Sequence, residues 1–506
     1  MSDESEHPTP GSGSGADFLQ LDRQTAPARG VTRWLVEGLR SAIADGRLRP
    51  GSPLPATRTL AQDLGVSRGV VVEAYQRLRD EGLAEGRVGH GTVITAMAGH
   101  LREPRPSPSS ALPVPSAGAV PPAPAGPPVL PLPSSWSEPV ELDLSPGLPD
   151  LSAFPRAAWL RAERAVLRDT TAGSLGYGDP RGDPRLRRQL AGWLARTRGL
   201  RADPEHILVV AGVAQALALL AQTLRARGAD TIAVEDPGSL GARQELQHWG
   251  LRPVGVPVDG DGLRVGELTG TGAAAALLTP AHQFPTGVVL APRRRRDLLA
   301  WAREGRLVIE DDYDAEHRYD RPPVPALQAS APDHIAHTGS TSKTLAPGLR
   351  LGWLVPPRHL HADLLRARYA SDIAGAVLPQ LVLAHLIATG ALDRHLRLVR
   401  SRHRLRRDAV LAALREHLPR ARVEGVAAGL HLLLLLPWLG EGVDDGALAA
   451  RVREVGVRVH PLSWHRLAPG PPGLVLGYAA HPPDRLREAV HRIAGVVPAG
   501  GVALRG

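Results

Sequence analysis

The chain has 506 residues, a formal net charge of +9, an ordinary 43% of hydrophobic residues and no cysteine. The length predicts two or three domains, and the missing cysteines exclude a disulfide framework, a cysteine nucleophile and a thiolate metal site. No metal site is predicted, and the net charge hints at a polyanionic partner. Residues 1–16 are polar, which predicts a disordered start instead of a signal peptide or anchor, so we expect a cytoplasmic protein. The longest apolar run, 208–224, is broken by Gly and Gln and predicts a buried strand and helix, not a membrane span.

Residues 17–95 have the pattern of a small helical module that ends in a hairpin. Helices are predicted over 31–48, 57–65 and 67–82 from apolar spacing, capping residues and glycine stops. A glycine-rich stretch that ends near residue 94 predicts a β-hairpin. Three helices and a hairpin predict a winged helix-turn-helix, whose recognition helix enters the major groove with its first residues at the base edges. These residues are Ser67, Arg68, Gly69 and Val70.

The segment LPATRTLAQDLGVSRGVVVEAYQRLRDEGLAEGRVGHGTVI, residues 54–94, resembles the GntR superfamily of bacterial regulators. The resemblance implies DNA contacts from Arg58 and Arg68, a phosphate contact from Ser67, and a wing tip in or near the minor groove. The wing tip is Gly89, His90 and Gly91. Within 17–95, 11 arginines stand against 9 acidic residues, so binding would depend on a few placed arginines and on dimeric avidity. A winged helix used for protein contacts is the alternative.

Residues 96–140 predict a proline-rich linker, with 13 prolines between Pro104 and Pro139. The body that follows, 141–506, alternates short apolar runs with amphipathic helical segments. That alternation predicts an α/β fold with a mostly parallel sheet. From about residue 390, an arginine-rich helix, a strand and a last helix predict a second, smaller α+β domain.

Lys343 is the single lysine of the chain, and the other 59 basic residues are arginines. Arginine matches lysine in charge, but it cannot supply a neutral primary amine because a guanidinium is never deprotonated in proteins. A Schiff base to an aldehyde cofactor therefore requires the lysine. The alternative is that Lys343 is an exposed surface residue that has been retained by chance and has no chemical role.

Three segments of the body supply the other groups that pyridoxal 5′-phosphate (PLP) needs. Residues 339–353 hold Lys343 and Arg350, residues 306–314 place carboxylates and a tyrosine at the end of an apolar strand, and residues 209–220 predict a strand, a glycine turn and the start of a helix. Ligands of open α/β sheets bind beyond the carboxyl ends of the strands, and helix N-terminal amides bind phosphate. An amine, an acid, a phenol and a cation are the groups that hold this cofactor.

The body resembles the fold-type I aminotransferases, and most closely the MocR subfamily of GntR regulators, which fuse a winged helix to such a domain. The motifs that carry the resemblance are LSPGLPDLSAFP (144–155), YGDPRGDPRLRRQLAGWLARTRGL (177–200), VEDPG (234–238), TPAHQFPTG (279–287), IEDDYDAEHRYD (309–320) and TSKTLAPGLRLGW (341–353). The fold class implied is multidomain: a winged helix-turn-helix plus an α/β PLP-dependent transferase fold with a smaller C-terminal α+β domain.

The resemblance also implies residue roles. Lys343 would form the internal aldimine, Asp311 would pair with the pyridine nitrogen, and Tyr313 would bind the ring oxygen. Ser340, Arg350 and the amides of Val213 and Ala214 would bind the phosphate. Tyr177 would reach the phosphate of a neighbouring subunit, which implies a homodimer with shared sites. His282 would touch the cofactor or cap a turn.

Several assignments stay open at this point. Asp312 is the alternative to Asp311, and Tyr319 is expected to be structural. The arginine run within 291–298 is expected to be the solvated start of a helix, with a second DNA contact as the alternative. For Arg77 and Arg79 we prefer a solvated helix face.

The sequence departs from aminotransferases at three places. Phe284 stands where an asparagine is usual, and Ser239 and Leu240 stand where a tyrosine is usual. The late strand within 473–481 has no arginine to bind a substrate α-carboxylate. We therefore predict a DNA-binding regulator that senses PLP or a PLP adduct, in vitamin B6 metabolism. The alternatives are a regulator with an amino acid or amine as small-molecule effector, bound as an external aldimine, and an active aminotransferase with a DNA-binding appendage.

Overall fold

The computed structural model forms two compact units, Met1–Val120 and Pro121–Gly506, and each is described by itself. The structure describes residues 26–27, 30–44, 48, 51–80, 83–87, 91–95, 139–319, 324–425, 428–440 and 442–498. Most of the predicted linker and the predicted disordered start therefore lie outside the described residues. No described helix is long and apolar enough to cross a membrane.

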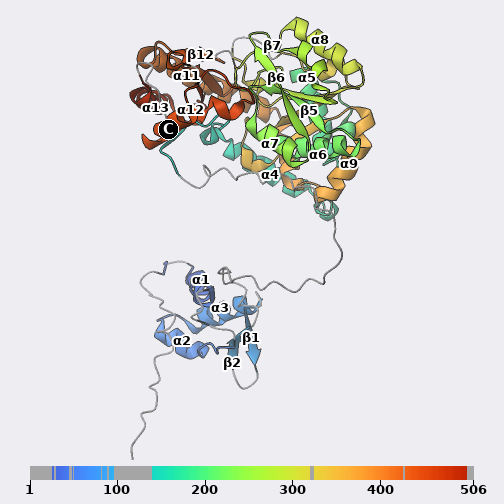
Figure 1. Ribbon diagram of the computed structural model, residues 1–506. Coiled ribbons are helices and arrows are strands. Elements are labelled where there is room, and N and C mark those ends of the chain that lie inside the picture. The colour runs from blue at the N-terminus through green and yellow to red at the C-terminus, as the bar shows by residue number, and fades with distance from the viewer. Residues whose placement is uncertain are drawn as a thin grey trace, which may run out of the picture. The chain divides into compact units, whose positions relative to one another are not determined.

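The N-terminal unit is a winged helix-turn-helix, as the sequence predicts (Figure 1). Its elements are α1 (Val31–Ala44), α2 (Thr57–Asp63), α3 (Arg68–Asp80) and the antiparallel strands β1 (Ala84–Arg87) and β2 (Gly91–Ile94). Leu35, Leu60 and Val71 are fully buried where the three helices meet, so one apolar face of each helix forms the core. The turn between α2 and α3 contains Gly65 at φ +61°, a conformation that favours glycine.

The body contains an eight-stranded sheet in the order β4-β11-β10-β9-β8-β5-β6-β7. Its strands are β4 (Leu208–Val210), β5 (Thr231–Asp236), β6 (Arg252–Asp259), β7 (Gly262–Leu263), β8 (Ala275–Leu278), β9 (Leu307–Asp311), β10 (Ile335–Ser340) and β11 (Gly352–Val355). The strands from β10 to β6 are parallel to their neighbours, and β11 and β7 are antiparallel. Asp311 pairs with Thr338, so β9 and β10 end close to each other.

Helices cover both faces of this sheet, which explains why its strands are apolar runs instead of alternating sequences. Successive residues of β9, Val308 and Ile309, are both fully buried but belong to different apolar clusters, one that includes α8 and one that includes α6 and α9. The helices are α4 (Arg156–Asp169), α5 (Pro184–Arg198), α6 (Val213–Ala226), α7 (Leu240–His248), α8 (Pro292–Arg303), α9 (Arg358–Asp372) and α10 (Val377–Ala388).

A smaller antiparallel sheet, in the order β12-β13-β16-β15, forms the second domain of the body. Its strands are β12 (Arg422–Glu424), β13 (His431–Leu435), β15 (His460–Pro461) and β16 (Gly473–Gly477), with α11 (Ala391–His417), α12 (Asp445–Glu454) and α13 (Pro483–Val496) beside them. The short strand β3 (Leu142–Asp143) pairs in parallel with β14 (Val457–Arg458), so the first residues of the body lie in this small domain.

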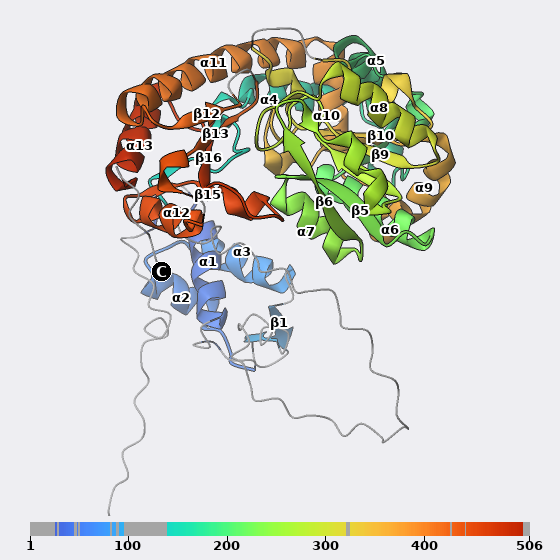
Figure 2. The same ribbon diagram turned by 45° about the horizontal axis from the view of Figure 1, so that its top comes forward.

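The long helix α11 joins the two domains of the body (Figure 2). Leu392 and Leu396, near its start, belong to an apolar cluster of the large domain. Val410 and Leu414, near its end, belong to the core of the small domain together with Leu142. One rigid helix therefore contributes to both cores.

Candidate cofactor site and DNA-binding surface

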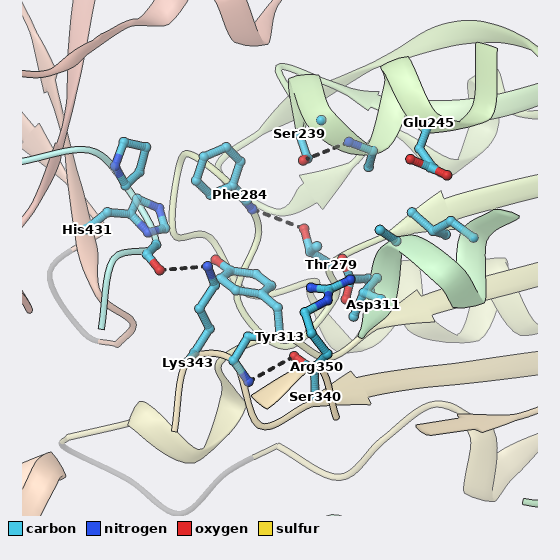
Figure 3. Close-up of a pocket in the computed structure, with 18 residues that line it drawn as sticks. Ser239, Glu245, Thr279, Phe284, Asp311, Tyr313, Ser340, Lys343, Arg350 and His431 are labelled. Carbon is cyan, nitrogen blue, oxygen red and sulfur yellow. Dashed lines mark hydrogen bonds between the residues drawn. The ribbon is translucent and has the colours of Figure 1, made fainter. Parts of the chain in front are cut away.

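A cavity of about 320 Å³ opens at the carboxyl ends of the parallel strands, where ligands of α/β sheets bind (Figure 3). Its walls are formed by Pro146, Gly147, Val213, Ala214, Leu217, Ser239, Gly241, Ala242, Glu245, Thr279, Phe284, Asp311, Tyr313, Ser340, Ser342, Lys343, Arg350 and His431. The structure therefore brings together seven of the predicted cofactor residues, which are Lys343, Asp311, Tyr313, Ser340, Arg350, Val213 and Ala214.

Lys343 lies in the turn that follows β10, and its amine points into the cavity (Figure 3). The Nζ atom donates a hydrogen bond of 2.6 Å to the carbonyl oxygen of Gly147. A Cβ atom on Gly147 would stand 2.6 Å from Nζ, and the φ of +85° at this position favours glycine, so the backbone approaches the amine closely here. Desolvation lowers the pKa of Lys343, although the nearby carboxylates of Asp314 and Asp311 oppose the shift. A lowered pKa favours the neutral amine that attacks an aldehyde.

The two neighbouring carboxylates at the end of β9 have different partners. Asp311 lines the cavity and accepts a 3.4 Å hydrogen bond from Thr338 Oγ1. Asp312 is buried against Arg198, whose Nε and Nη2 atoms donate bonds of 2.5 and 3.1 Å to it. Burial, and then the negative charge of Asp312, raise the pKa of Asp311 to about 7. A carboxyl group with a pKa near neutrality is suited to share a proton with a heterocyclic nitrogen.

Tyr313 also faces the cavity, and His282 lies behind it. His282 is buried, and its Nδ1 atom lies 3.0 Å from the Tyr313 hydroxyl and 2.9 Å from Asp314 Oδ2. His282 itself is not among the residues that line the cavity, so its predicted contact with a cofactor stays a prediction. What the structure gives is its contact with the phenol of Tyr313. Burial and the charge of Asp314 raise the pKa of Tyr313, so the phenol keeps its proton and remains a donor.

The opposite end of the cavity has the features of an anion site. Arg350 has a left-handed backbone at φ 50°, and its guanidinium donates to the carbonyl oxygen of Ala211. Gly212, at φ +87°, precedes the first turn of α6, and a Cβ atom there would stand 3.3 Å from Arg350 Nη1. The first amides of a helix have no acceptor within the helix and attract anions. Ser340 lies beside Arg350 (Figure 3), and its hydroxyl accepts a 3.3 Å hydrogen bond from the amide of Ser342.

Tyr177 is apart from this cavity. Its side chain is 92% exposed, and it lines a separate hollow together with residues 173–185 and 374–380. The predicted contact of Tyr177 with the site of a neighbouring subunit stays a prediction.

Sequence reasoning missed three residues that the fold brings to the cavity of Lys343. Gly147 arrives from the start of the body, Thr279 follows β8, and His431 begins β13 in the small domain. His431 is the one polar residue in the otherwise apolar run from Leu430 to Leu436, and that exception is the signal that could have identified it.

Comparisons with known proteins agree with this geometry. The model of the aminotransferase class I and II family matches residues 141–493, and the model of bacterial regulatory proteins of the gntR family matches residues 32–94. The chain is 35% identical over 468 residues to the HTH-type pyridoxine biosynthesis transcriptional regulator PdxR of Corynebacterium glutamicum, covering 92% of this chain and 96% of that protein. It is 32% identical over 482 residues to the probable rhizopine catabolism regulatory protein MocR of Rhizobium meliloti, covering 94% and 95%. The chain belongs to the MocR subfamily of GntR transcription regulators.

Solved structures confirm the predicted fold-type I body of this regulator. An archaeal alanine:glyoxylate aminotransferase superposes with a TM-score of 0.65 at 26% identity, over 72% of this chain and 91% of that one. A kynurenine aminotransferase of Pyrococcus horikoshii gives a TM-score of 0.64 at 26% identity, over 71% and 91%. A domain of the aminotransferase class I and II family typically binds PLP.

The helix-turn-helix of this regulator implies DNA binding, and most of its predicted contact residues within the described chain are exposed. Arg58, Ser67, Arg68 and Gly69 are exposed around the start of α3, and Arg68 Nε lies 3.4 Å from Thr57 Oγ1. Val70 differs from them because it packs partly against the core. Gly91 begins β2, whereas Gly89 and His90 lie outside the described residues.

Other arginines of the regulator have structural partners. Arg77 forms a 2.5 Å ion pair with Glu73 on α3. In α8, Arg294 pairs with Asp259, and Arg295 donates to the carbonyl oxygen of Pro325. Two arginines of the run within 291–298 therefore bind partners within the body. Tyr319 donates to the carbonyl oxygen of Gly429 at 2.6 Å, which is a structural role.

Proposed function

We propose that this regulator binds PLP in the cavity, with Lys343 forming the Schiff base. The observation that carries this proposal is that the single lysine of the chain stands in the cavity among an acid, a phenol and an anion site. PLP would supply an aldehyde for the amine and a ring that withdraws electrons. Asp311 would hold the ring nitrogen, and Tyr313 the ring oxygen.

The phosphate would bind between Arg350, Ser340 and the amides of Val213 and Ala214. The fit is supported by two glycines, because a Cβ atom on Gly147 would stand 2.6 Å from Lys343 Nζ and one on Gly212, just before α6, would stand 3.3 Å from Arg350 Nη1. Tyr177 of a neighbouring subunit would complete this end in a homodimer, and its 92% exposure leaves it available for such a contact.

The effector that we propose is PLP itself or an adduct of PLP, and the output is a change in operator binding. A relative named for pyridoxine biosynthesis supports control of vitamin B6 metabolism by this chain. A protein that acts on operator DNA would work in the cytoplasm. An amino acid or amine effector and a working aminotransferase are the rival functions. One observation argues against a working aminotransferase. Within the described chain, Lys343 and Arg350 are the only lysine or arginine residues that line the cavity, so no further cation there could bind a substrate carboxylate.

The test begins with a PLP titration of purified protein, followed by visible absorbance. Wild type should acquire the band of a protein-bound Schiff base, and Lys343→Arg should not, because arginine keeps the charge but offers no amine. The α-amino group of the chain is the other primary amine, and a blocked N-terminus controls for it. An unchanged band in Lys343→Arg would remove the assignment.

The second arm measures function. A DNA site selected from a random pool is titrated with apo and PLP-loaded protein at fixed salt, and the loaded protein is incubated with amino acids under multiple-turnover conditions. The proposal expects a change in DNA affinity with PLP alone. Identical DNA isotherms would favour an amino acid effector, and steady release of a keto acid would identify an aminotransferase.

A further inference from the structure

Phe284 and His431 lie on the side of the cavity beyond the Lys343 amine (Figure 3), where the amine also meets the carbonyl oxygen of Gly147. The Phe284 and His431 rings are 4.8 Å apart between centroids. Phe284 packs on an apolar cluster of the small domain, formed by the buried side chains of Leu433, Leu462 and Val475. This side of the cavity is called the amine-side wall below.

His431 gives the amine-side wall a neutral hydrogen-bonding group. Its Nε2 atom lies 3.2 Å from the carbonyl oxygen of Pro285, which can only accept, so Nε2 carries the proton. Nδ1 of the neutral ring is therefore an acceptor. Burial, and then the neighbouring His282, lower the pKa of His431 to about 3, so the ring has no positive charge at neutral pH.

Two arginines lie at His465, whose ring packs on Phe284, and both have other partners. Arg243 is buried and donates to the carbonyl oxygens of Trp464 and His465 at 2.7 and 3.0 Å. Arg466 donates to the carbonyl oxygen of Pro471 at 2.5 Å. Arg350 lies at the anion end with Ala211. Within the described chain, the amine-side wall therefore presents acceptors and an aromatic ring to a ligand, and its one cationic group is the Lys343 amine itself.

An α-amino acid whose nitrogen takes the place of the Lys343 amine has its carboxylate one carbon away, close to this wall. There the carboxylate would lose water and would meet the carbonyl oxygen of Gly147, the ring of Phe284 and a neutral imidazole. A buried carboxylate without a cation or donor is strongly unfavourable. A primary amine without the carboxylate avoids this cost, and a hydroxyl on it can donate to an acceptor of the wall.

We propose that His431 and Phe284 are specificity-determining residues that exclude α-carboxylates from the Lys343 site and admit carboxylate-free amines. This inference rests on the proposed binding of PLP through Lys343. It names the ligand class that can join the cofactor, which is a primary amine or amino alcohol instead of an α-amino acid.

The experiment compares L-alanine with ethylamine, which differ by the carboxylate alone. Full-length PLP-loaded protein is titrated with each, and the visible absorbance of bound PLP gives the half-saturating concentration. We compare wild type with His431→Arg, which adds a cation to the wall, and with His431→Gln, which keeps it neutral. His431→Arg should lower the alanine-to-ethylamine ratio of these concentrations by about tenfold or more, the factor expected for one charge-assisted hydrogen bond. His431→Gln should keep the wild-type ratio.

Three results would overturn the inference. They are equal response of wild type to both probes, an unchanged ratio in His431→Arg, and the same change in His431→Gln as in His431→Arg. If His431→Arg does not load PLP, Phe284→Arg introduces the cation from the facing residue and should change the ratio in the same direction. The PLP band is recorded first for every protein. Its absence in wild type refutes the proposed function and this inference with it, whereas a normal band without discrimination refutes this inference alone.

Discussion

The adjacent carboxylates Asp311 and Asp312 allow a sharp test, because the same substitution should have opposite effects on stability. Asp312 is buried against Arg198, at 2.5 and 3.1 Å, so Asp312→Asn leaves a buried guanidinium without its main partner. Removing one member of a buried ion pair costs about 3–5 kcal/mol. The negative charge of the neighbouring Glu310 also stabilises the charged form of Arg198. Because this interaction remains in Asp312→Asn, we expect a loss of stability toward the lower end of that range.

Asp311→Asn should stabilise the apo protein. Burial raises the pKa of Asp311 from 3.8 to about 7, so the folded state holds this proton more tightly than the unfolded chain. The ionised form is therefore unfavourable, and stability is lost as pH rises from about 4 through 7. Each pKa unit corresponds to about 1.4 kcal/mol, so the gain from a neutral side chain reaches up to about 4 kcal/mol at pH 8 and vanishes near pH 4.

The assay is chemical unfolding of apo wild type and both variants, followed by near-ultraviolet circular dichroism at pH 8 and near pH 4. PLP binding is the second measurement: Asp311→Asn should weaken it, and Asp312→Asn, under conditions where it is folded, should retain it. The reasoning is refuted if Asp311→Asn destabilises the protein by several kcal/mol while Asp312→Asn leaves stability unchanged. That outcome would favour Asp312 over Asp311 as the partner of the cofactor's ring nitrogen.

Three further predictions concern DNA and the cofactor. Arg68→Ala should abolish specific DNA binding in a mobility-shift assay and leave PLP binding intact, because a bidentate guanine contact is worth about 1–3 kcal/mol per half-site; Arg77→Ala is the control, and loss of binding there instead would contradict the helix assignment. Arg350→Ala should weaken PLP about tenfold or more in a titration but leave pyridoxal unaffected; equal loss for both ligands would argue against a phosphate contact. PLP alone should change operator affinity by about 1–3 kcal/mol in a DNA titration, the usual size of a coupling free energy; superimposable isotherms would refute a cofactor sensor.

Short sequence patterns were sufficient to predict those cavity residues that belong to a single local segment. Lys343 could be singled out because the chain has no other lysine, and the strand, glycine turn and helix start within 209–220 could be read from the sequence directly. The choice between Asp311 and Asp312 could only be weighed, because the partner that separates them, Arg198, lies 114 residues away in the sequence. A strand alternates its side chains, but the alternation does not say which face holds the cofactor.

Long-range pairings explain what sequence reasoning missed. β3 pairs with β14 across more than 300 residues, which brings the first residues of the body to the small domain and Gly147 to the Lys343 amine. His431 reaches the cavity because the small sheet lies against the large domain at Phe284. His282 was expected at the cofactor or at a turn, and its place behind Tyr313 follows from a hydrogen bond to Asp314 that no local pattern predicts.

The loop that leads into α7 connects the cavity to the small domain. Asp236 accepts hydrogen bonds from the amides of Leu467 and Ala468 at 2.9 and 3.0 Å, and Arg243 donates to the carbonyl oxygens of residues 464–465. Between these two anchors, the same loop and helix line the cavity with Ser239, Gly241 and Ala242. A ligand shifts an equilibrium only through contacts that differ between two states. A cofactor bound against this loop would touch the segment that holds the small domain, so its occupancy would bias the arrangement of the two domains of the body without touching DNA.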